Sequence, residues 1–394
     1  MHRLHSKSHL YLSLATSLVI ILPLEFTVAA PVTDNLDIGG AIRARFDYDP
    51  DRDIQKLSLD TIRLDVNYKS DSWIGSGSYR CYGGSYPYEY VDSICDIAFP
   101  SHAWVGYRID QGQQVHVGLN QVPFGLQPYF GGTFFEGIGN VIGLEDVHNL
   151  GVKYIKDTPD WNLQAAYYPI DGGQGKGTSR GGKSYSTNIA DADDYVVDGS
   201  DNIEKNKIAL RYTRKLEISN WASEIGGSAF TSTLENQDTD KNGRRSAFAA
   251  HYSGKNGPFG VELQAARQII SPENSGSNKY ITFGGYDGTF NVAAKGNLYV
   301  AHVSYDLPDN YWLISGMQIY SNYSLFDKSE SAFKNSQRFI VGTSFSFKDL
   351  YIYVEWLHGK NDPYVGGSSY TDSLAMGGSD QWENQLYTNI GYYF

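Results

Sequence analysis

The chain has 394 residues, of which 41% are hydrophobic, and its formal net charge is -12. This acidity does not suit a nucleic-acid partner, because phosphate binding requires a basic surface. The 31 tyrosines, 18 phenylalanines and 42 glycines, set against 3 methionines, indicate an all-β protein rich in turns.

The N-terminal segment has the layout of a secretory signal peptide. Two basic residues precede an apolar run at 10–24, and the small residues Ala29 and Ala30 follow. We therefore expect residues 1–30 to be a cleaved signal peptide. Cleavage after Ala30 would leave a proline at the new N-terminus, so cleavage after Ala29 is the alternative. An uncleaved anchor is disfavoured, because a spanning helix needs about 20 apolar residues.

The rest of the chain alternates apolar and polar side chains in sixteen stretches of about ten residues. In the second stretch, Ile62, Leu64 and Val66 alternate with Arg63 and Asp65. This pattern is typical of strands that have one apolar and one wetted face. In chain order the predicted strands are 37–47, 58–68, 73–82, 98–108, 113–121, 149–156, 161–169, 205–215, 219–231, 245–253, 259–269, 296–306, 311–321, 337–347, 350–358 and 384–394.

The connections between these strands alternate between short and long. Short connections carry turn residues, as in Lys348-Asp349. Short turns on one rim and long loops on the other are typical of a transmembrane barrel. We therefore predict that residues 31–394 form a 16-stranded antiparallel transmembrane β-barrel with short periplasmic turns, long extracellular loops and a water-filled lumen. A soluble β-sandwich or β-helix is the competing fold. The long connections are polar and glycine-rich, and they lie at 122–148, 170–204, 270–295 and 359–383.

The two cysteines, Cys81 and Cys95, bracket a segment that has the composition of a turn. In an oxidising compartment we expect them to form one disulfide that holds a loop. Their spacing differs from the C-x-x-C of redox pairs, which favours a structural role.

The last predicted strand ends on an aromatic residue and places Leu386, Ile390, Tyr392 and Phe394 on one face. Tyr392 and Phe394 resemble the C-terminal signature of outer-membrane barrels, by which the barrel-assembly machinery recognises its clients. The resemblance implies a location in the bacterial outer membrane, in contact with lipid and lipopolysaccharide. On a soluble protein the same strand would be an aggregation-prone edge.

The passage Val117-Gly118-Leu119-Asn120-Gln121-Val122-Pro123-Phe124-Gly125 resembles the family of phosphate-selective and related porins. In that family a similar P-F-G ends the fifth strand and enters a loop that folds into the lumen. The resemblance implies that the 122–148 loop constricts the pore and that the protein is a homotrimer. It implies a porin, through which ions and small hydrophilic solutes diffuse passively. We expect no cofactor and no metal site.

The predicted constriction joins an acidic loop to a basic wall. An acidic loop facing a basic wall would set a transverse field that orients solutes and favours one ion sign. Alternatively, the arginines pair with Asp37, Asp47 and Asp65 and hold the wall together. Phosphate selectivity is disfavoured, because acids accompany the basic residues. The loop residues are Phe124, Tyr129, Glu136, Glu145 and Asp146, and the wall residues are Arg43, Arg45, Arg63, Arg80 and Arg108.

Aromatic side chains also fall on the predicted inner face. They would suit stacking on sugars, although aromatic residues near strand ends also form the interfacial girdles of barrels. These residues are Trp104, Tyr168, Tyr351, Tyr353 and Tyr387.

Two other functions remain open. An adhesin or surface receptor would use the long loops, and its contact candidates are the acidic residues Asp191, Asp193, Asp194, Asp198 and Asp201. An outer-membrane hydrolase would need a serine or aspartate activated by histidine. The histidines at 102, 116, 148, 251, 302 and 358 are scattered without such spacing. The segment 177–184 fits the P-loop pattern but lacks the flanking strand and helix, so we expect an ordinary loop.

Overall fold

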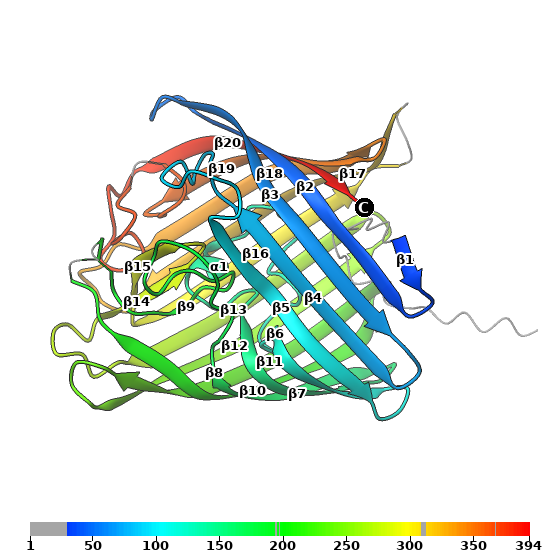
Figure 1. Cartoon of the computed structure of the whole chain (residues 1–394), viewed down its shortest axis with the longest axis horizontal. Helices are drawn as coiled ribbons and strands as arrows, with labels where there is room; N and C mark the ends of the chain where they lie inside the picture. The colour runs from blue at the N-terminus through cyan, green and yellow to red at the C-terminus, as the bar shows by residue number, and fades with distance from the viewer. Residues whose placement is uncertain (1–29, 194, 197, 309–312, 367) are drawn as a thin grey trace, which may run out of the picture.

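The computed structural model of the protein describes residues 30–193, 195–196, 198–308, 313–366 and 368–394. Sixteen antiparallel strands form a closed ring, because the last of them pairs with the first. This confirms the predicted fold class. Figure 1 shows the barrel from the side, with the long loops on the left and the short turns on the right. The strands of the ring are β2 (Leu36–Asp49), β3 (Ile54–Lys69), β4 (Trp73–Tyr82), β5 (Ile97–Arg108), β6 (Gln113–Gln121), β7 (His148–Asp157), β8 (Trp161–Ile170), β10 (Asn202–Ile218), β11 (Trp221–Asn236), β12 (Asn242–Asn256), β13 (Phe259–Ser271), β16 (Lys295–Asp306), β17 (Ile314–Lys328), β18 (Ser336–Phe347), β19 (Leu350–Lys360) and β20 (Trp382–Tyr393).

A few short elements lie outside the ring. A strand at the start of the described chain, β1 (Ala30–Thr33), pairs with β2. Within the long loops, β9 (Asn188–Ile189), β14 (Tyr280–Gly285) and β15 (Gly288–Ala293) form a small separate sheet. A helical turn, α1 (Ile138–Val141), belongs to the connection between β6 and β7.

Two sequence features bear on membrane insertion and export. Among the described residues, no helix has the length and apolarity needed to cross a membrane. Residues 1–29, which contain nearly all of the predicted signal peptide, lie outside the described residues.

The alternation of side chains gives the barrel an apolar outside and a polar inside. Along β3, Ile62, Leu64 and Val66 are exposed on the outer face, whereas Arg63 between them is buried inside. The ring pairs the backbone groups of every strand with those of its neighbours, as a hydrocarbon environment requires. An apolar outer band is the surface that a lipid bilayer accommodates.

The ring closes through the strand that carries the predicted assembly signal. Tyr392 and Phe394 are both exposed on the outer face, and their ring centroids are 6.1 Å apart. The backbone of Phe394 exchanges two hydrogen bonds with Gly40, which lies within β2. The side chain of Tyr393, between them, points inward and lines the lumen.

Several strands continue further than predicted toward the long-loop rim. β17 begins at Ile314 and ends at Lys328, seven residues beyond the predicted end at 321. The extra length escapes a pattern search because Phe326 points inward and is fully buried. Apolar residues on both faces remove the contrast on which the prediction depends.

Candidate functional site

The connection between β6 and β7, residues 122–147, folds into the lumen and is held by hydrogen bonds to distant strands. The amide of Gly125 donates to Ser228 Oγ on β11 at 2.8 Å, and that of Leu126 donates to Gln264 Oε1 on β13 at 2.8 Å. In return, Arg211 Nε donates to the carbonyl of Gly125 at 2.7 Å. Polar residues of the inner wall thus satisfy the backbone of the loop.

The middle of this loop is anchored to the strands near the end of the chain. The amides of Phe134 and Phe135 donate to the two oxygens of Glu355, at 2.7 and 3.0 Å, and Tyr320 Oη donates to the same carboxylate at 2.6 Å. Arg338 Nη1 donates to the carbonyl of Glu136 at 3.1 Å. A carboxylate that accepts three hydrogen bonds is a strong anchor.

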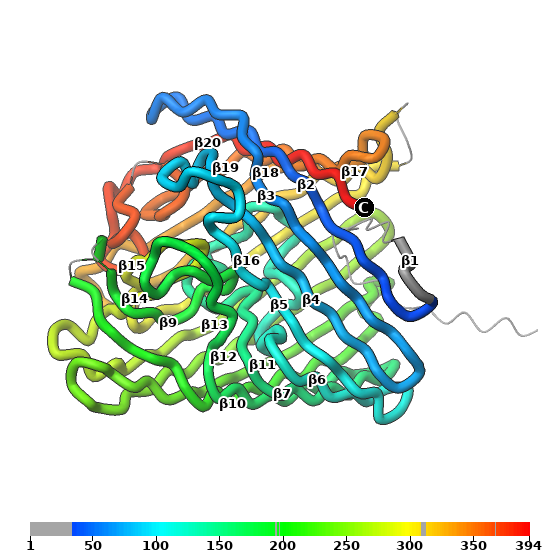
Figure 2. The backbone as a smooth tube through the Cα atoms, in the orientation of Figure 1, coloured from blue at the N-terminus to red at the C-terminus, as the bar shows by residue number. Residues whose placement is uncertain are grey.

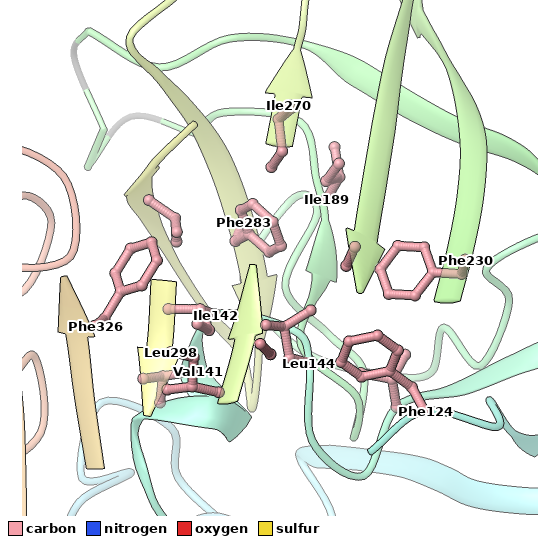
Figure 3. Packing of buried hydrophobic residues seen from close by; sticks show 14 of the residues in the cluster. Phe124, Val141, Ile142, Leu144, Ile189, Phe230, Ile270, Phe283, Leu298 and Phe326 are labelled. Carbon is pink, nitrogen blue, oxygen red and sulfur yellow. The ribbon is translucent and has the colours of Figure 1, made fainter. Parts of the chain in front are cut away.

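An apolar cluster fills one part of the lumen. Figure 3 shows Ile142 and Leu144 of the loop packed with Phe283 of β14, Phe230 of β11 and Phe326 of β17. In Figure 2 the connection 171–201, coloured green, gathers beside β14 and β15 at the long-loop rim. Burial of this size gives the loops a core of their own inside the barrel.

Three long loops meet at the turn between β14 and β15. Its two residues, Tyr286 and Asp287, have φ angles of 53° and 64°, the backbone of a two-residue hairpin turn. Asp287 accepts hydrogen bonds from Tyr90 Oη at 3.0 Å, Thr178 Oγ1 at 2.8 Å and the amide of Ser179 at 2.9 Å. The P-loop-like segment therefore serves as a fastening between loops.

This hairpin was not predicted, although the sequence contains a signal for it. The stretch 270–295 was expected to be an irregular loop. It contains two alternating runs, Tyr280-Ile281-Thr282-Phe283 and Thr289-Phe290-Asn291-Val292, on either side of Asp287-Gly288. An Asp-Gly pair between two such runs is a hairpin signal.

A cavity of about 750 Å³ remains beside the loops. It is bounded by the connection 122–147 and by the inner faces of β2 to β4 and β18 to β20. Its lining begins at Tyr90 and Tyr370 in the long loops and reaches Tyr351 and Tyr393, close to the short-turn ends of β19 and β20. The cavity therefore extends along the barrel from one rim toward the other. Of the described residues, fourteen tyrosines and five arginines line it, and the arginines are Arg43, Arg45, Arg52, Arg80 and Arg338.

Three of the five predicted wall arginines line this cavity. Arg43 and Arg45 both lie near Asp60, at 3.3 and 3.7 Å, and Arg45 also forms a bidentate pair with Asp47 at 2.7 Å. The Arg45 guanidinium stacks over the ring of Tyr387 at 4.9 Å. Arg80, the third, has no carboxylate partner among the described residues and lies over an aromatic ring.

The other two predicted arginines are placed elsewhere. Arg63 pairs with Asp65 at 2.8 Å, and Arg108 donates to the carbonyl of Ser70 at 2.8 Å in a short turn. Neither lines the cavity. Arg338 was not selected from the sequence, although alternation in the predicted strand 337–347 gave it the same inward direction as its neighbours on that face.

Of the predicted acidic residues, Glu136 borders the cavity. Glu145 and Asp146 lie inside the loop, where Glu145 Oε1 accepts from the amide of Phe130 at 2.6 Å and Asp146 Oδ2 accepts from Tyr185 Oη at 2.5 Å. Burial, together with Asp146 and Glu145, raises the pKa of Glu136 well above its usual range. Burial is also the main cause that raises the pKa of Glu145 to about 8.

The two predicted aromatic residues of the loop have different surroundings. Phe124 is buried in the apolar cluster, where its ring packs edge-on against Phe230 with centroids 5.2 Å apart. Tyr129 lines the cavity. Further along the inner face, Tyr351, Tyr353 and Tyr387 also line the cavity, as their alternation suggested.

The disulfide between Cys81 and Cys95 is present, with a Cα–Cα distance of 4.4 Å. It joins the end of β4 to the end of the loop that precedes β5. That loop presents Tyr86, Tyr88 and Tyr90 to the cavity. The bridge therefore holds part of the cavity lining.

Three of the five acidic residues considered as surface contacts interact within their own loop, whereas Asp198 is exposed. Asp191 and Asp201 flank Arg180, at 3.8 and 3.2 Å, and Asp193 accepts from Ser179 Oγ at 3.2 Å. Asp194 lies outside the described residues. Within the described part of the chain, no group of three histidine, cysteine or acidic side chains is placed to hold a metal ion.

No family model matches the chain, and no curated protein matches it. Solved structures do. The outer-membrane channel DcaP of Acinetobacter baumannii aligns over 91% of this chain and 97% of its own, with 13% identity and a TM-score of 0.56. The outer-membrane protein OmpT of Vibrio cholerae, in its trimer form, aligns over 91% and 99%, with 13% identity and a TM-score of 0.55.

An anion-selective porin from Comamonas acidovorans aligns over 91% of this chain and 99% of its own, with 12% identity and a TM-score of 0.53. The protein has the fold of the bacterial porins. At this level of identity the likeness establishes the shared barrel architecture, and the solute must be argued from the residues of this cavity.

Proposed function

We propose that the protein is a porin of the bacterial outer membrane, a passive diffusion channel for ions and small hydrophilic solutes. One observation carries this proposal: inside a closed barrel, a cavity lined by guanidinium and hydroxyl groups extends from the long loops toward the short turns. Such a lining favours water and polar solutes, while the apolar outer face suits lipid. The structural likeness to outer-membrane channels supports the same function.

We assign the constriction of this channel to the connection 122–147 and the wall that faces it. Tyr129 and Glu136 belong to the loop side, and Arg43, Arg45 and Arg80 belong to the wall side. In this assignment Glu145 and Asp146 shape the loop from within and do not meet the solute.

The proposal is tested by recording single channels of the refolded protein in a planar bilayer. We expect stepwise conductance that a bulky maleimide reduces by about half or more when it is attached to a cysteine introduced by Thr133→Cys, at the cavity surface. The two native cysteines are bonded to each other and do not compete for the label. Gln237→Cys, in an exposed turn away from the cavity, is the matched control and should leave conductance unchanged when labelled.

A folded barrel that never conducts would reject the channel. Conductance that is insensitive to the label at position 133 would reject this cavity as its path.

Export and assembly complete the proposal. We propose that residues 1–30 are cleaved after export and that the barrel-assembly machinery recognises the terminal strand through Tyr392 and Phe394. The exposure of both rings on the outer face, beside the closing seam, supports this role. We place the short turns in the periplasm and the long loops outside the cell, where they contact lipopolysaccharide.

We also propose a homotrimer. The support is the trimer form of OmpT, whose fold this chain shares. Chemical cross-linking in detergent should give a ladder that ends at three subunits, and a protein that remains at one subunit would contradict the proposal.

The alternatives have less support. Among the six histidines beyond the predicted signal peptide, His102 contacts Ser76 Oγ at 2.8 Å, but this pair lies outside the cavity, which does not favour a hydrolase acting there. In the 171–201 loop, Asp191, Asp193 and Asp201 contact Arg180 or Ser179, which does not favour their use as an adhesive surface.

A further inference from the structure

Arg80 is the arginine of the cavity that lacks an acidic partner. Among the described residues it forms no ion pair, and its Nε is buried without a hydrogen-bond partner. Its guanidinium carbon lies 4.3 Å from the centre of the Tyr185 ring. Guanidinium donors that are withdrawn from water favour a planar anion, which they bind through two parallel hydrogen bonds. Each of the other four arginines contacts an aspartate: Arg43 and Arg45 contact Asp60, Arg52 contacts Asp49, and Arg338 contacts Asp362.

The surroundings of Arg80 are tyrosines. Tyr82, Tyr185 and Tyr286 are electrostatic neighbours of its guanidinium and line the same cavity. The ring of Tyr286 lies 6.3 Å from that of Tyr82 and 5.4 Å from that of Tyr185, and Tyr88 lies 5.5 Å from Tyr82. Together these rings form a continuous aromatic surface beside one uncommitted cation.

The hydroxyls of this surface distinguish between possible solutes. Those of Tyr90 and Tyr185 are bonded to Asp287 and Asp146. Those of Tyr88 and Tyr286 make no hydrogen bond with the described residues and are not sealed from solvent. A site for an aromatic solute would not need these hydroxyls, because phenylalanine rings would stack on it equally well. The side chains of Tyr88 and Tyr286 are partly exposed, and their free hydroxyls suit a solute that carries many hydroxyls of its own.

We propose that this part of the cavity is a binding subsite for acidic sugars, the uronates and their short oligomers. The Arg80 guanidinium pairs with the carboxylate, the tyrosine rings pack against the C–H face of the pyranose, and the hydroxyls of Tyr88 and Tyr286 bond to those of the sugar. The cavity volume of about 750 Å³ lies within the range of small-molecule sites, about 300 to 1,000 Å³. This inference rests on the proposed porin function, because it places the subsite on the solute path.

The acidic residues of the same cavity do not cancel this cation. Asp287 accepts three hydrogen bonds, and Asp60 is shared by Arg43 and Arg45. Glu136 lies beside the buried acids Glu145 and Asp146, whose charges oppose its ionisation. Arg80 therefore remains a positive group that is available to the carboxylate of a solute.

The test uses full-length protein, and D-galacturonate is the probe. In single-channel recordings galacturonate should interrupt the current, and Arg80→Gln should weaken its affinity at least about tenfold, as expected for loss of a charge-assisted bidentate contact. Tyr286→Phe removes one hydroxyl while keeping the ring, and should weaken it about threefold. Arg214→Gln, at an exposed position outside the cavity, is the matched control and should leave the affinity for galacturonate unchanged.

Three comparison solutes complete the design. Galactose, which lacks the carboxylate, should bind at least about tenfold more weakly than galacturonate. Benzoate or inorganic phosphate binding as tightly as galacturonate would overturn the sugar class, in favour of an aromatic acid or a general anion. Equal affinity in wild type and Arg80→Gln would overturn the subsite.

Calorimetric titration of the protein in detergent with the same solutes measures their binding independently of any channel current. A channel that conducts salt but does not bind galacturonate would therefore reject the inference alone. A protein that binds galacturonate without ever conducting would reject the porin function and keep the subsite.

Discussion

Glu136 stands at the cavity surface with two more acids, Glu145 and Asp146, close to it inside the loop. Burial and these two acids raise the pKa of Glu136. The charges of Arg80 and Arg338 lower it, but by less. A carboxyl with a raised pKa stays neutral at a pH where an ordinary one is charged. The loop is thus less acidic in the folded protein than its sequence indicates.

This arrangement predicts that ion selectivity depends on pH in the alkaline range. As pH rises through about 8, where Glu145 ionises, the loop gains negative charge, and the preference for cations should increase about two- to fivefold. The folded state holds the Glu145 proton up to a pH of about 8, whereas the unfolded chain releases it near the ordinary pKa of about 4.5. The stability that this proton contributes is therefore full below about pH 4.5 and is lost progressively as pH rises from there to about 8.

The measurement is the reversal potential under a salt gradient between pH 6 and pH 10. Glu136→Gln removes the charge that borders the cavity and should flatten the dependence. Glu145→Gln keeps a hydrogen-bond acceptor for the Phe130 amide and should partly flatten the pH dependence of the reversal potential. A wild-type curve that does not change with pH would contradict the assignment.

Side-chain alternation predicted the direction of the arginines but not their partners. Of the five arginines predicted for the inner face, Arg43, Arg45 and Arg80 line the cavity, whereas Arg63 and Arg108 do not. Whether an inward arginine is neutralised depends on residues that come from other strands and loops, such as Asp60 and Asp362. Those contacts follow from strand register and loop packing, which no local pattern encodes.

At the level of elements, the loop from 83 to 96 is held by a bridge at its base. The disulfide closes a segment with a sequence separation of 14, and the chain-entropy account gives such a closure about 3 kcal/mol, although its mechanism is disputed. Tyr88 of this loop packs on Tyr82, which in turn packs on Phe99. Opening of the loop would remove part of the cavity lining without disturbing the ring of strands.

We therefore expect the double variant Cys81→Ser, Cys95→Ser to fold into the barrel but to expose this loop. Chymotrypsin should cut after Tyr88 or Tyr90 at least about tenfold faster than in wild type, because local opening costs less free energy. Wild type treated with a reductant should behave like the variant, and the variant should not respond to the reductant. Equal cutting rates in all samples would show that packing alone holds the loop.

Regular strands were predicted from the sequence far better than the elements inside the lumen. Each of the sixteen strands has a period of two, because its two faces meet different media. The hairpin of β14 and β15 is buried on both sides, so its alternation carries little contrast. The anchoring of the loop to Glu355 joins residues more than 200 positions apart, and nothing local to either indicates it.

On the scale of the whole molecule, the outer face should respond to charge according to depth in the membrane. Leu210 lies midway along β10 and is 50% exposed on the outside, whereas Leu216 lies near the short-turn end and is 38% exposed. Leu210→Arg should lower the free energy of unfolding by about 2–4 kcal/mol, and Leu216→Arg by about 0–1 kcal/mol.

Urea unfolding in lipid vesicles measures both values. The pair is matched in strand, residue type and substitution, so that depth is the difference between them. Similar losses at the two positions would mean that this face of β10 meets protein or water in place of a bilayer.

The division of the lumen into a filled part and an open part has a consequence for how the proposed channel would diversify. The apolar cluster packs on β8 to β17, whereas the open path runs along β2 to β4 and β18 to β20. Substitutions on the second arc change which molecules pass and leave the packing of the first arc intact. After gene duplication, changes at a few tyrosines and arginines would therefore alter the solute specificity of one copy, while the packed arc maintains the fold.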